Sequence, residues 1–366
     1  VRLRPYYEQE LPGGRYRRYS LDGRYGLAEH RSYLQGAFTY QSDPLHSETW
    51  HLKGGYKIEE INRTEPVPEW LNSIYTLTRE RNYLKLYRSI FAKGIYKREW
   101  SNGLYGSVSV EWEDRSVPPN HTVQTWFPRS DLRYTPNRFH PSLEGPPRVL
   151  RSTLEWTLRP GQRYERYPNS KRVVETPYPE IYGSFEGAFP MGEGWAEYGR
   201  FELGTGEHFD LGLGGRMRID LYGGDFLFQK EQLAIMDRKH FAGNRTLWLR
   251  SAGEGRGTDP WGSHRLRSFH TLPYYARFTR SRYGAAHFQH RFQGWLFNKV
   301  PLLRRLNWHL LVGGNALYTE DQGPYAELYT GVENIFKLIR VDLALPVHPR
   351  LEETPYWRIG LSSSIF

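Results

Sequence analysis

The feature that most constrains this chain is a two-residue alternation of apolar and polar side chains. In residues 104–113 the apolar positions include Val108, Val110 and Trp112, and Ser109 and Glu111 lie between them. Successive side chains of a strand point to opposite faces. The pattern therefore predicts a strand with one apolar face and one polar face.

The same alternation recurs along the chain, in residues 50–59, 150–159, 209–222, 306–313 and 339–345. Turn-forming residues separate the strands, at 159–161, 223–224 and 321–324. Several segments reach about ten residues, the length that crosses a bilayer when tilted. Strands of soluble proteins average about five to six residues. The length of the alternating segments favours strands that span a membrane.

Composition fits the same interpretation. Only 38% of residues are hydrophobic, yet 16% are aromatic. A large soluble β-sandwich or propeller is compatible with these values, but the strand length favours a barrel. In a barrel one face of each strand meets lipid and the other meets a polar lumen, and aromatic residues form girdles at the two membrane interfaces. We expect an all-β fold: a transmembrane antiparallel β-barrel of about 16 strands (14–16), an even number. Residues 1–366 would form this single outer-membrane domain, in a bacterial cell outer membrane.

Several classes of protein are excluded or disfavoured. The chain has no cysteine, which rules out disulfides, thiolate metal sites and cysteine nucleophiles. It has no apolar run long enough for a transmembrane helix. The first residues are not a signal peptide, so we expect the numbering to begin after cleavage or within a longer chain. The net charge of +10 is scattered among acidic residues, which favours outer-membrane lipid and lipopolysaccharide phosphates as anionic neighbours over nucleic acid.

Three connections break the alternation. Within residues 67–88, Trp70, Ile74, Leu77 and Leu84 fall near a period of 3.6, which predicts a short helical insertion of one or two helices. That insertion either plugs the lumen or packs on the rim. Residues 115–147 are rich in proline, and residues 251–270 are rich in glycine. We expect both to be long loops, which in such barrels are usually extracellular.

Charged residues on the polar faces are the candidate functional residues. They would face the lumen and either line a pore or form a plug of paired charges: Lys53, Lys57, Arg151, Glu155, Arg159, Arg216, Arg218, Asp220, Arg340 and Asp342. Both alternatives stay open at this point.

Catalytic and metal chemistry find little support. His287 and His290 are three residues apart, so on a strand they lie on opposite faces and cannot share a metal. Ser268 and His270 are close in sequence but lack an orienting acid. We expect no catalytic residue, no metal and no cofactor.

The end of the chain alternates as well. Trp357, Ile359, Leu361 and Ile365 precede the terminal Phe366. An amphipathic last strand with a terminal aromatic is similar to the signal that the outer-membrane assembly machinery reads on its clients. We therefore expect that machinery to be a partner during biogenesis.

Several motifs together resemble a family of uncharacterised outer-membrane proteins from Bacteroidota. They are RNYLKLY at 81–87, SNGL at 101–104, FAGN at 241–244, HFQHRF at 287–292, NKVPLLRRL at 298–306, GVENIF at 331–336 and IRVDL at 339–343. Members of that family carry an N-terminal carboxypeptidase-regulatory-like domain and a C-terminal barrel. The resemblance implies that such a module precedes this numbering, and that no catalytic residue can be transferred.

The last third of the chain is also similar to a wider superfamily. That group contains the outer-membrane insertases and the two-partner-secretion translocators, which have sixteen strands. The two resemblances imply a non-enzymatic barrel that acts as a scaffold or translocation unit in envelope biogenesis or secretion, with envelope proteins as partners. The alternative is a passive or gated channel for small solutes, which the charged polar faces favour. A lipid-modifying enzyme using Ser268 is a third class, without a triad to support it.

Overall fold

The structure is a computed structural model. It describes residues 2–63, 67–120, 125–128, 134, 137, 145–243, 266–292, 294, 297–299, 301, 303–348 and 355–361. Within these residues the fold is all-β apart from one α-helix and a few short 3-10 turns. None of the helices in the described ranges is long and apolar enough to cross a membrane.

One large antiparallel sheet of 16 strands dominates the fold, as the alternation predicts. Its order is β1-β3-β4-β5-β6-β7-β8-β11-β12-β13-β18-β19-β20-β21-β22, and β2 also pairs with β3. Strands that follow one another along the chain are therefore neighbours, apart from the small strands inserted in the long connections. This meander is the simplest arrangement for antiparallel strands joined by short turns.

The chain divides into two compact units. Unit 1 comprises residues 1–176, 183–201 and 226–238, and unit 2 comprises 177–182, 202–225 and 239–366. Three strands contribute residues to both units: β11 (Glu180–Ala188), β12 (Tyr198–Asp210) and β13 (Arg216–Gln229).

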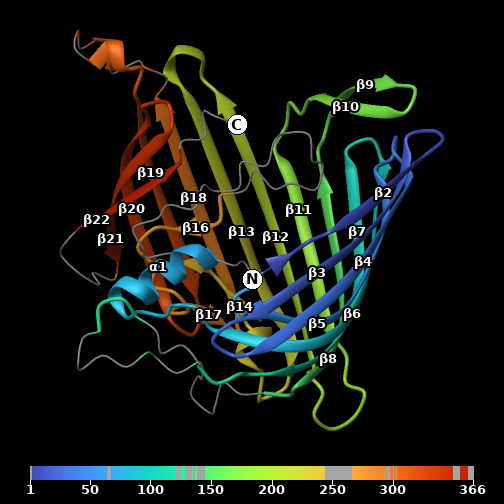
Figure 1. The fold of residues 1–366 in the computed structure, drawn as a ribbon. Helices are drawn as coiled ribbons and strands as arrows, with labels where there is room; N and C mark the ends of the chain where they lie inside the picture. Colours follow the sequence, from blue (N-terminus) through green and yellow to red (C-terminus); the bar gives the residue numbers. More distant parts are fainter. Residues whose placement is uncertain are drawn as a thin grey trace. The chain divides into compact units, whose positions relative to one another are not determined.

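Unit 1 contains the first strands and the only α-helix in the described part of the chain (Figure 1). Its elements are β1 (Arg2–Leu3), β2 (Tyr6–Leu11), β3 (Arg15–Gly26), β4 (Arg31–Asp43), β5 (Glu48–Glu60), α1 (Glu69–Arg79), β6 (Leu86–Ser101), β7 (Leu104–Ser116), β8 (Arg148–Leu158) and the hairpin β9 (Arg163–Tyr167) with β10 (Ser170–Glu175), followed by the short turn η3 (Ile235–Asp237).

Unit 2 contains the later strands of the sheet and several short inserted elements. They are η2 (Gly212–Gly214), β14 (Lys239–His240), β15 (Ala242–Gly243), β16 (Ser268–Phe269), β17 (Phe278–Thr279), β18 (Tyr283–Phe292), η4 (Phe297–Lys299), η5 (Leu303–Leu306), β19 (His309–Thr319), β20 (Gly323–Ile335), β21 (Ile339–His348) and β22 (Tyr356–Leu361). The pairs β14–β17 and β15–β16 form two small sheets.

The helical insertion is present but shorter than predicted. Helix α1 begins after Pro68, whose fixed φ suits a helix start. It ends where Glu80 adopts a left-handed conformation, with φ 52° and ψ 35°. The predicted range of 67–88 is wrong at its end, because β6 already begins at Leu86. Trp70 and Ile74 are about half exposed on the helix, and Leu71 is buried instead.

The strand predicted over 209–222 is wrong. Strand β12 ends at Asp210 and β13 begins at Arg216, with η2 between them. Gly215 has φ 108° and passes so close to the Arg291 backbone that a Cβ would lie 2.0 Å from its carbonyl oxygen. Leu211 and Leu213 therefore belong to a tight turn and do not share a strand face with Leu221.

Other strand and turn boundaries also differ from the predicted ones. The glycine pair at 223–224 was predicted to be a turn, but it lies inside β13. The strand predicted from residue 306 begins at His309. The connection from β7 to β8 covers residues 117–147, because β7 extends to Ser116, two residues into the predicted loop of 115–147. Most of the predicted 251–270 loop lies outside the described residues, and its end forms β16.

Candidate functional site

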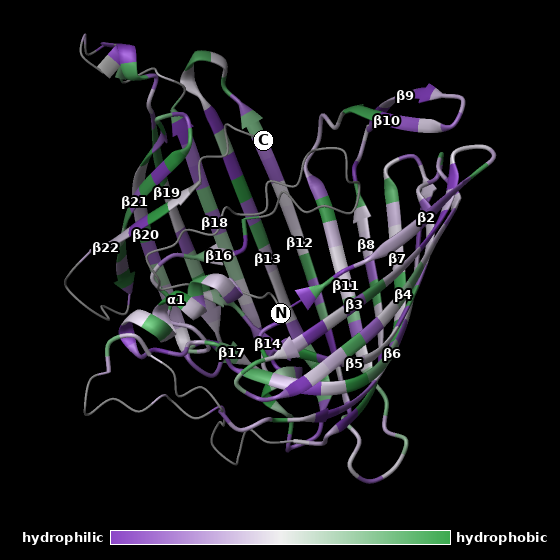
Figure 2. Cartoon of the chain, viewed as in Figure 1, coloured by the Kyte–Doolittle hydropathy of each residue, from purple (hydrophilic) through white to green (hydrophobic). Residues whose placement is uncertain are grey.

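The strands of unit 1 expose apolar side chains and bury charged ones. We call these two sides of the strands the apolar face and the ionic face. Exposed residues on the apolar face include Trp50, Leu52, Val108, Val110 and Leu154. Buried residues on the ionic face include Lys57, Glu111, Glu113, Arg115 and Arg151. Figure 2 shows hydrophobic and hydrophilic residues alternating along the strands.

Unit 2 shows the same arrangement, in which apolar side chains are exposed and charged ones are buried; we call this inverted burial. Its apolar face exposes Leu221, Leu328, Leu345, Trp357 and Ile359, and its ionic face buries Asp220, Glu327, Asp342 and Arg358. The extreme case is β22, where Trp357 is 63% exposed and its neighbour Arg358 is 1% exposed. The candidate functional sites are the charge networks on the ionic face of each unit.

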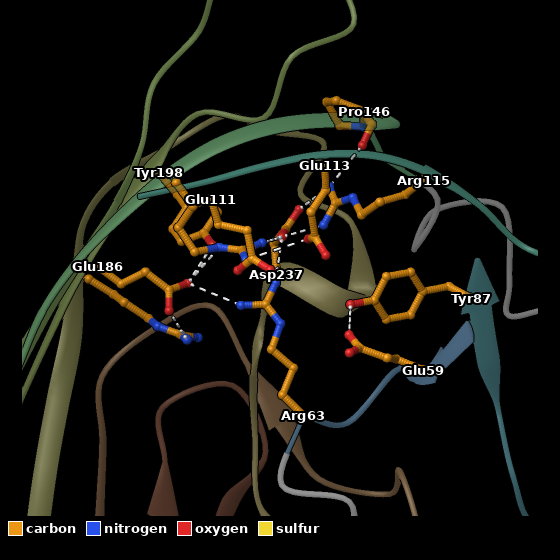
Figure 3. A network of polar contacts seen from close by, with 12 residues as sticks. Glu59, Arg63, Tyr87, Glu111, Glu113, Arg115, Pro146, Glu186, Tyr198 and Asp237 are labelled. Carbon is orange, nitrogen blue, oxygen red and sulfur yellow. Dashed lines mark hydrogen bonds and ion pairs between the residues drawn. The ribbon is translucent and has the colours of Figure 1, made fainter. Parts of the chain in front are cut away.

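In unit 1 the network centres on Asp237, which η3 carries between β13 and β14. The Arg115 guanidinium donates to both Asp237 carboxylate oxygens, at 2.6 and 2.8 Å. Arg151 donates to Oδ1 at 3.2 Å, and an Arg63 nitrogen lies 3.6 Å from the same oxygen. Figure 3 shows Asp237 among side chains that come from several separate strands and connections.

A second carboxylate, Glu186 on β11, shares these arginines. Arg151 Nε lies 3.3 Å from its Oε1, and Arg200 donates to its Oε2 at 3.0 Å. The Tyr198 hydroxyl donates to Oε1 at 2.5 Å and accepts from Arg151 at 3.0 Å. Arg151 is thus held on several sides, with its side chain 3% exposed.

The network continues onto β5, β6 and β7. Lys57 Nζ lies 2.8 Å from Glu59, 3.1 Å from Glu113 and 3.4 Å from Glu111. Lys93 and Arg151 each lie 3.1 Å from Glu111 Oε2. The members of this network, which we call the Asp237 network, are Lys57, Arg63, Lys93, Arg115, Arg151, Arg200, Glu59, Glu111, Glu113, Glu186 and Asp237. Positive and negative groups nearly balance, which is what allows them to be buried.

The connection that carries Asp237 packs firmly onto unit 1. Leu233, Ala234 and Ile235 are each no more than 3% exposed. Leu233 packs in a cluster with Val149 and Tyr198. Burial raises the pKa of Asp237, but the charge and hydrogen bonds of Arg115 outweigh it and hold that pKa below its ordinary value. Asp237 is therefore an anion that fixes the connection to β7 and β8.

In unit 2 a different inserted segment is held by one carboxylate on β20. Glu327 accepts from the backbone N–H of His270 at 2.5 Å and of Thr271 at 2.7 Å. It also accepts from Thr271 Oγ1 at 2.8 Å, Asn315 at 2.6 Å and Tyr325 at 2.7 Å. Five donors on one buried carboxylate clamp residues 270–271 against the sheet.

Further contacts hold the inserted segment as a whole, residues 266–279. The Arg358 guanidinium donates to the His270 carbonyl oxygen. Arg277 donates to the carbonyls of Gln322 and Gly323 at 2.9 and 2.8 Å, in the β19–β20 turn. Burial lowers the pKa of His270 well below its ordinary value, and the nearby Arg358 lowers it further. His270 is therefore a neutral side chain.

Two smaller ionic clusters lie on the unit 2 strands. Glu202 contacts Lys239, accepts from Tyr283 at 2.8 Å and pairs with Arg267 at 2.8 Å. Arg340 donates to both oxygens of Asp342, at 2.9 and 2.7 Å. Gly331 lies against this pair, and a Cβ there would sit 2.0 Å from Asp342 Oδ1.

The predicted charged residues fall into two groups. Lys57, Arg151, Asp220, Arg340 and Asp342 make the buried contacts of the two units, Asp220 by accepting from Tyr182 at 2.5 Å. The others are more accessible: Lys53, Glu155 and Arg216 are exposed, and Arg218 and Arg159 are half-buried. Arg216 lies 3.6 Å from Asp210 at the η2 turn, and Arg159 lies beyond the end of β8, over the Tyr105 ring.

Sequence reasoning missed the carboxylates that organise both networks. Glu111 and Glu113 occupy alternate positions of β7, so the two-residue pattern was a sufficient signal for them. Glu327 alternates with Tyr325 and Tyr329 on β20 in the same way. Asp237 lies in a connection without periodicity, and nothing in the sequence indicates its role.

Of the residues predicted as an assembly signal, Trp357, Ile359 and Leu361 lie on β22. Ile365 and Phe366 lie outside the described residues. His287 and His290 lie on β18 three residues apart; His287 bonds Asn315 at 2.8 Å and His290 the Gly214 carbonyl at 3.1 Å. Among the described residues, no group of three or more potential ligands is placed to hold a metal.

Comparison with known proteins gives one family. No curated protein matches the chain significantly. Among solved structures, CdiB from Acinetobacter baumannii is similar, with 11% identity and a TM-score of 0.38. That match covers 98% of this chain, which spans only 58% of the CdiB chain. The model of the family of unknown function DUF5686, C-terminal domain, matches residues 1–332. Because this match covers most of the chain, the protein belongs to the DUF5686 family through its C-terminal domain.

Proposed function

We propose that residues 1–366 close into a single barrel in a bacterial outer membrane, where the protein acts as a non-enzymatic scaffold or translocation unit in envelope biogenesis. The inverted burial of both units carries this proposal. Leu328 is 59% exposed, but the adjacent Glu327 is 1% exposed. In water each exposed leucine forfeits roughly 1.5–3 kcal/mol of burial free energy. In lipid the same face is favourable, and the ionic face must turn inward.

A row of side chains across the unit 1 strands supports a membrane boundary. The register aligns Gln9, Arg17, Tyr40, Trp50 and Tyr96 in one line across β2 to β6. The Trp50 and Tyr96 rings lie 4.4 Å apart. Arg17 lies over the Tyr40 ring at 5.4 Å. Amphipathic aromatics beside a cation are typical of the interface between hydrocarbon and head groups.

This row lies toward the strand ends that are joined by the short turns β2–β3, β4–β5 and β6–β7. At the opposite ends of the unit 1 strands, the β5–β6 and β7–β8 connections are long and include α1 and residues 117–147, whereas β3 and β4 are joined by residues 27–30 alone. The β8–β11 connection, which carries the hairpin β9–β10, is the long one at the ends near the aromatic row. Barrels have short periplasmic turns and longer extracellular loops. We therefore assign the aromatic row to the periplasmic leaflet and the opposite ends of the strands to the leaflet with lipopolysaccharide. The outer-membrane assembly machinery is the proposed partner during biogenesis.

Scaffold or translocation is favoured over an open channel by the two inserted segments. Residues 233–237 cover part of the ionic face of unit 1, and residues 270–271 are clamped to the ionic face of unit 2. Each uses a buried carboxylate that accepts several charged or backbone donors. A passive channel for small solutes is the second candidate, because Lys53 and Glu155 on the ionic face remain exposed to water.

Membrane insertion is tested by expressing the full protein behind an outer-membrane signal and fractionating cells. We expect the protein in the outer membrane, extractable only with detergent, and migrating faster on a gel before boiling than after it. Recovery from buffer without detergent as a folded monomer would overturn the proposal.

The two functions are separated by planar-bilayer recordings and by crosslinking in intact cells. A scaffold or translocation unit should show little steady conductance and should recover the same envelope proteins in repeated experiments. A large steady conductance without reproducible partners would favour the channel instead.

A further inference from the structure

The hairpin β9–β10 of unit 1 forms a two-stranded sheet of its own, separate from the large sheet. Figure 1 shows it beyond the ends of the unit 1 strands. A Cβ on Gly14, in the β2–β3 turn, would lie 2.9 Å from Asn169 Cβ and 3.5 Å from Pro44 Cγ, in the β4–β5 turn. Asn169 is at the tip of the hairpin, so this tip lies against the short turns of the sheet.

The root of the hairpin is anchored on the ionic face. Glu99 lies six residues after Lys93 on β6, which places both on that face, and Tyr105 is its partner on β7. Gln162, just before β9, donates to Glu99 Oε1 at 3.1 Å and accepts from the Tyr105 hydroxyl at 3.1 Å. Glu99, Tyr105 and Gln162 are all buried. The hairpin therefore leaves the sheet on its ionic side.

An ion pair fastens the second strand of the hairpin to the same carboxylate. Lys171 Nζ on β10 lies 2.5 Å from Glu99 Oε1 and 3.3 Å from Asn102 Oδ1. The Lys171 side chain is 12% exposed and that of Glu99 is 1% exposed. Residues 163–170, between Gln162 and Lys171, are all exposed. Lys171 therefore fastens an exposed hairpin to a buried anchor.

The two contacts place the hairpin across the strand ends. Its tip meets the β2–β3 turn at Gly14, and its root meets the β6–β7 turn, where Asn102 donates to the Gln162 carbonyl oxygen at 2.7 Å. Neighbouring strands of a sheet are about 4.8 Å apart. The hairpin therefore crosses the ends of several strands, on the side of the ionic face.

The ion pair can open without leaving Glu99 uncompensated. When Lys171 leaves, Glu99 Oε1 keeps two donors, the Gly103 backbone N–H at 2.9 Å and Gln162 Nε2 at 3.1 Å. Lys171 regains water, and in a buried pair this hydration offsets much of the lost attraction. Opening therefore costs the hairpin one ion pair and the contact at its tip.

We propose that the β9–β10 hairpin is a gate over the ionic face of unit 1, latched by the Lys171–Glu99 ion pair. When the pair is formed, the hairpin covers the ends of the strands on the side of the wet interior. When the pair breaks, the hairpin moves away and the interior opens to the periplasm. The inference rests on the proposed barrel and adds how its translocation path is regulated.

The latch is tested by brief acylation of amines in the full, detergent-folded protein. Mass spectrometry gives the acylation rate of Lys171 relative to Lys230, whose side chain is 43% exposed. Glu99→Gln should raise this relative rate at least about tenfold, the effect of a loss of roughly 1.4 kcal/mol. The matched control is Glu165→Gln, which removes a carboxylate from the exposed strand β9 and should leave the rate unchanged.

The gate is tested by planar-bilayer recordings of the same proteins. Glu99→Gln and Lys171→Gln should each open at least about ten times as often as the wild type. The control is Arg166→Gln, because Arg166 is exposed and lies directly opposite Lys171 in the hairpin. It removes the same charge from the same hairpin without touching the latch, and its openings should match those of the wild type.

Faster acylation of Lys171 without more frequent openings would overturn the gate, because the ion pair would then be a structural contact only. An unchanged acylation rate in Glu99→Gln would overturn the latch. Circular dichroism and the gel shift on boiling identify any variant that fails to fold. If the wild type inserts in the outer membrane but the latch variants behave like it, the gate falls and the barrel stands. If the wild type folds without detergent, the barrel falls and the gate with it.

Discussion

At the scale of single residues, the stability of unit 1 depends on buried charges, of which Asp237 is the clearest case. Asp237 is 1% exposed and accepts from two arginines, with a third nearby. A buried ion pair contributes little beyond an apolar replacement, but removal of one partner leaves an uncompensated charge. The effect of a substitution here is therefore much larger than the net value of the pair.

Asp237→Asn should lower the free energy of unfolding by about 3–5 kcal/mol, because Arg115 and Arg151 keep their charges without the carboxylate. Tryptophan fluorescence during urea unfolding in detergent micelles measures this. The control is Asp210→Asn, whose carboxylate is 63% exposed and 3.6 Å from Arg216. That exposed pair should contribute at most about 1 kcal/mol. Equal effects of the two variants would contradict the network.

The same carboxylate sets a pH dependence. The pKa of Asp237 is lowered in the folded protein from its ordinary value of 3.8, because Arg115 outweighs the effect of burial. Its stabilisation is therefore fully present above that ordinary value and is lost as the pH falls toward the folded-state pKa. The stability difference between wild type and Asp237→Asn should shrink as unfolding is measured at successively lower pH. A difference that grows in acid would show the opposite sign.

Gly331 offers a test of packing on the ionic face of unit 2. Gly331→Ala would place a Cβ 2.0 Å from Asp342 Oδ1 and push apart the Arg340–Asp342 pair. We expect a loss of about 1–3 kcal/mol, typical of overpacking. Gly36→Ala is the control, because its Cβ would meet only Leu21 Cδ2 at 3.9 Å. Denaturant midpoints of the two variants decide the point.

At the scale of elements, the alternation predicts strands well and their ends poorly. Residues 104–113 and 339–345 fall within β7 and β21, and the segment predicted over 150–159 lies in β8 except for its last residue. A strand with one apolar face and one polar face repeats every two residues, so the pattern finds it. The tight turn after Asp210 was missed because the apolar spacing continues through Leu211 and Leu213. The glycines at 223–224 suggested a turn by composition alone, yet they continue β13.

The inserted segments show a second limit of sequence reasoning. Asp237 and residues 270–271 are placed by partners distant in the chain, such as Arg115 and Glu327. No local pattern encodes these contacts. The sequence therefore indicates only the charged partner that lies on a strand, and not the partner in the connection. Arg151 was predicted on the polar face for that reason, and Asp237 was not predicted.

The Glu327 contacts predict how firmly residues 266–279 are held. Glu327→Gln keeps the size of the side chain but turns an amide N–H₂ toward the backbone donors of His270 and Thr271. Trypsin cleavage of the folded protein at Arg267 and Arg277 should then become at least about tenfold faster, since a loss of roughly 1.4 kcal/mol is tenfold in the open population. Glu320→Gln, in an exposed turn position, should leave the cleavage rate unchanged. Equal rates in both variants would mean that other contacts hold the segment.

At the scale of the whole molecule, one question decides the interpretation of every residue, namely which solvent each face of the sheet meets. A water-soluble protein tolerates a lysine or arginine in place of an exposed apolar side chain, usually within about 0.5 kcal/mol. A barrel in lipid does not, because a cation near the bilayer midplane costs about 2–4 kcal/mol. An apolar side chain has the same exposed fraction whether its face meets water or lipid. The cost of replacing it with a cation therefore reports which solvent that face meets.

The decisive comparison uses two apolar residues that are equally exposed but differently placed. Leu328 on β20 and Val174 on the β9–β10 hairpin are each 59% exposed. Leu328→Arg should lower the free energy of unfolding in lipid vesicles by about 2–4 kcal/mol, because its side chain would face hydrocarbon. Val174→Arg should change it by less than about 0.5 kcal/mol, because the hairpin does not belong to the large sheet. If both arginines are tolerated equally, the apolar face meets water, and the buried charges of both units need a different explanation.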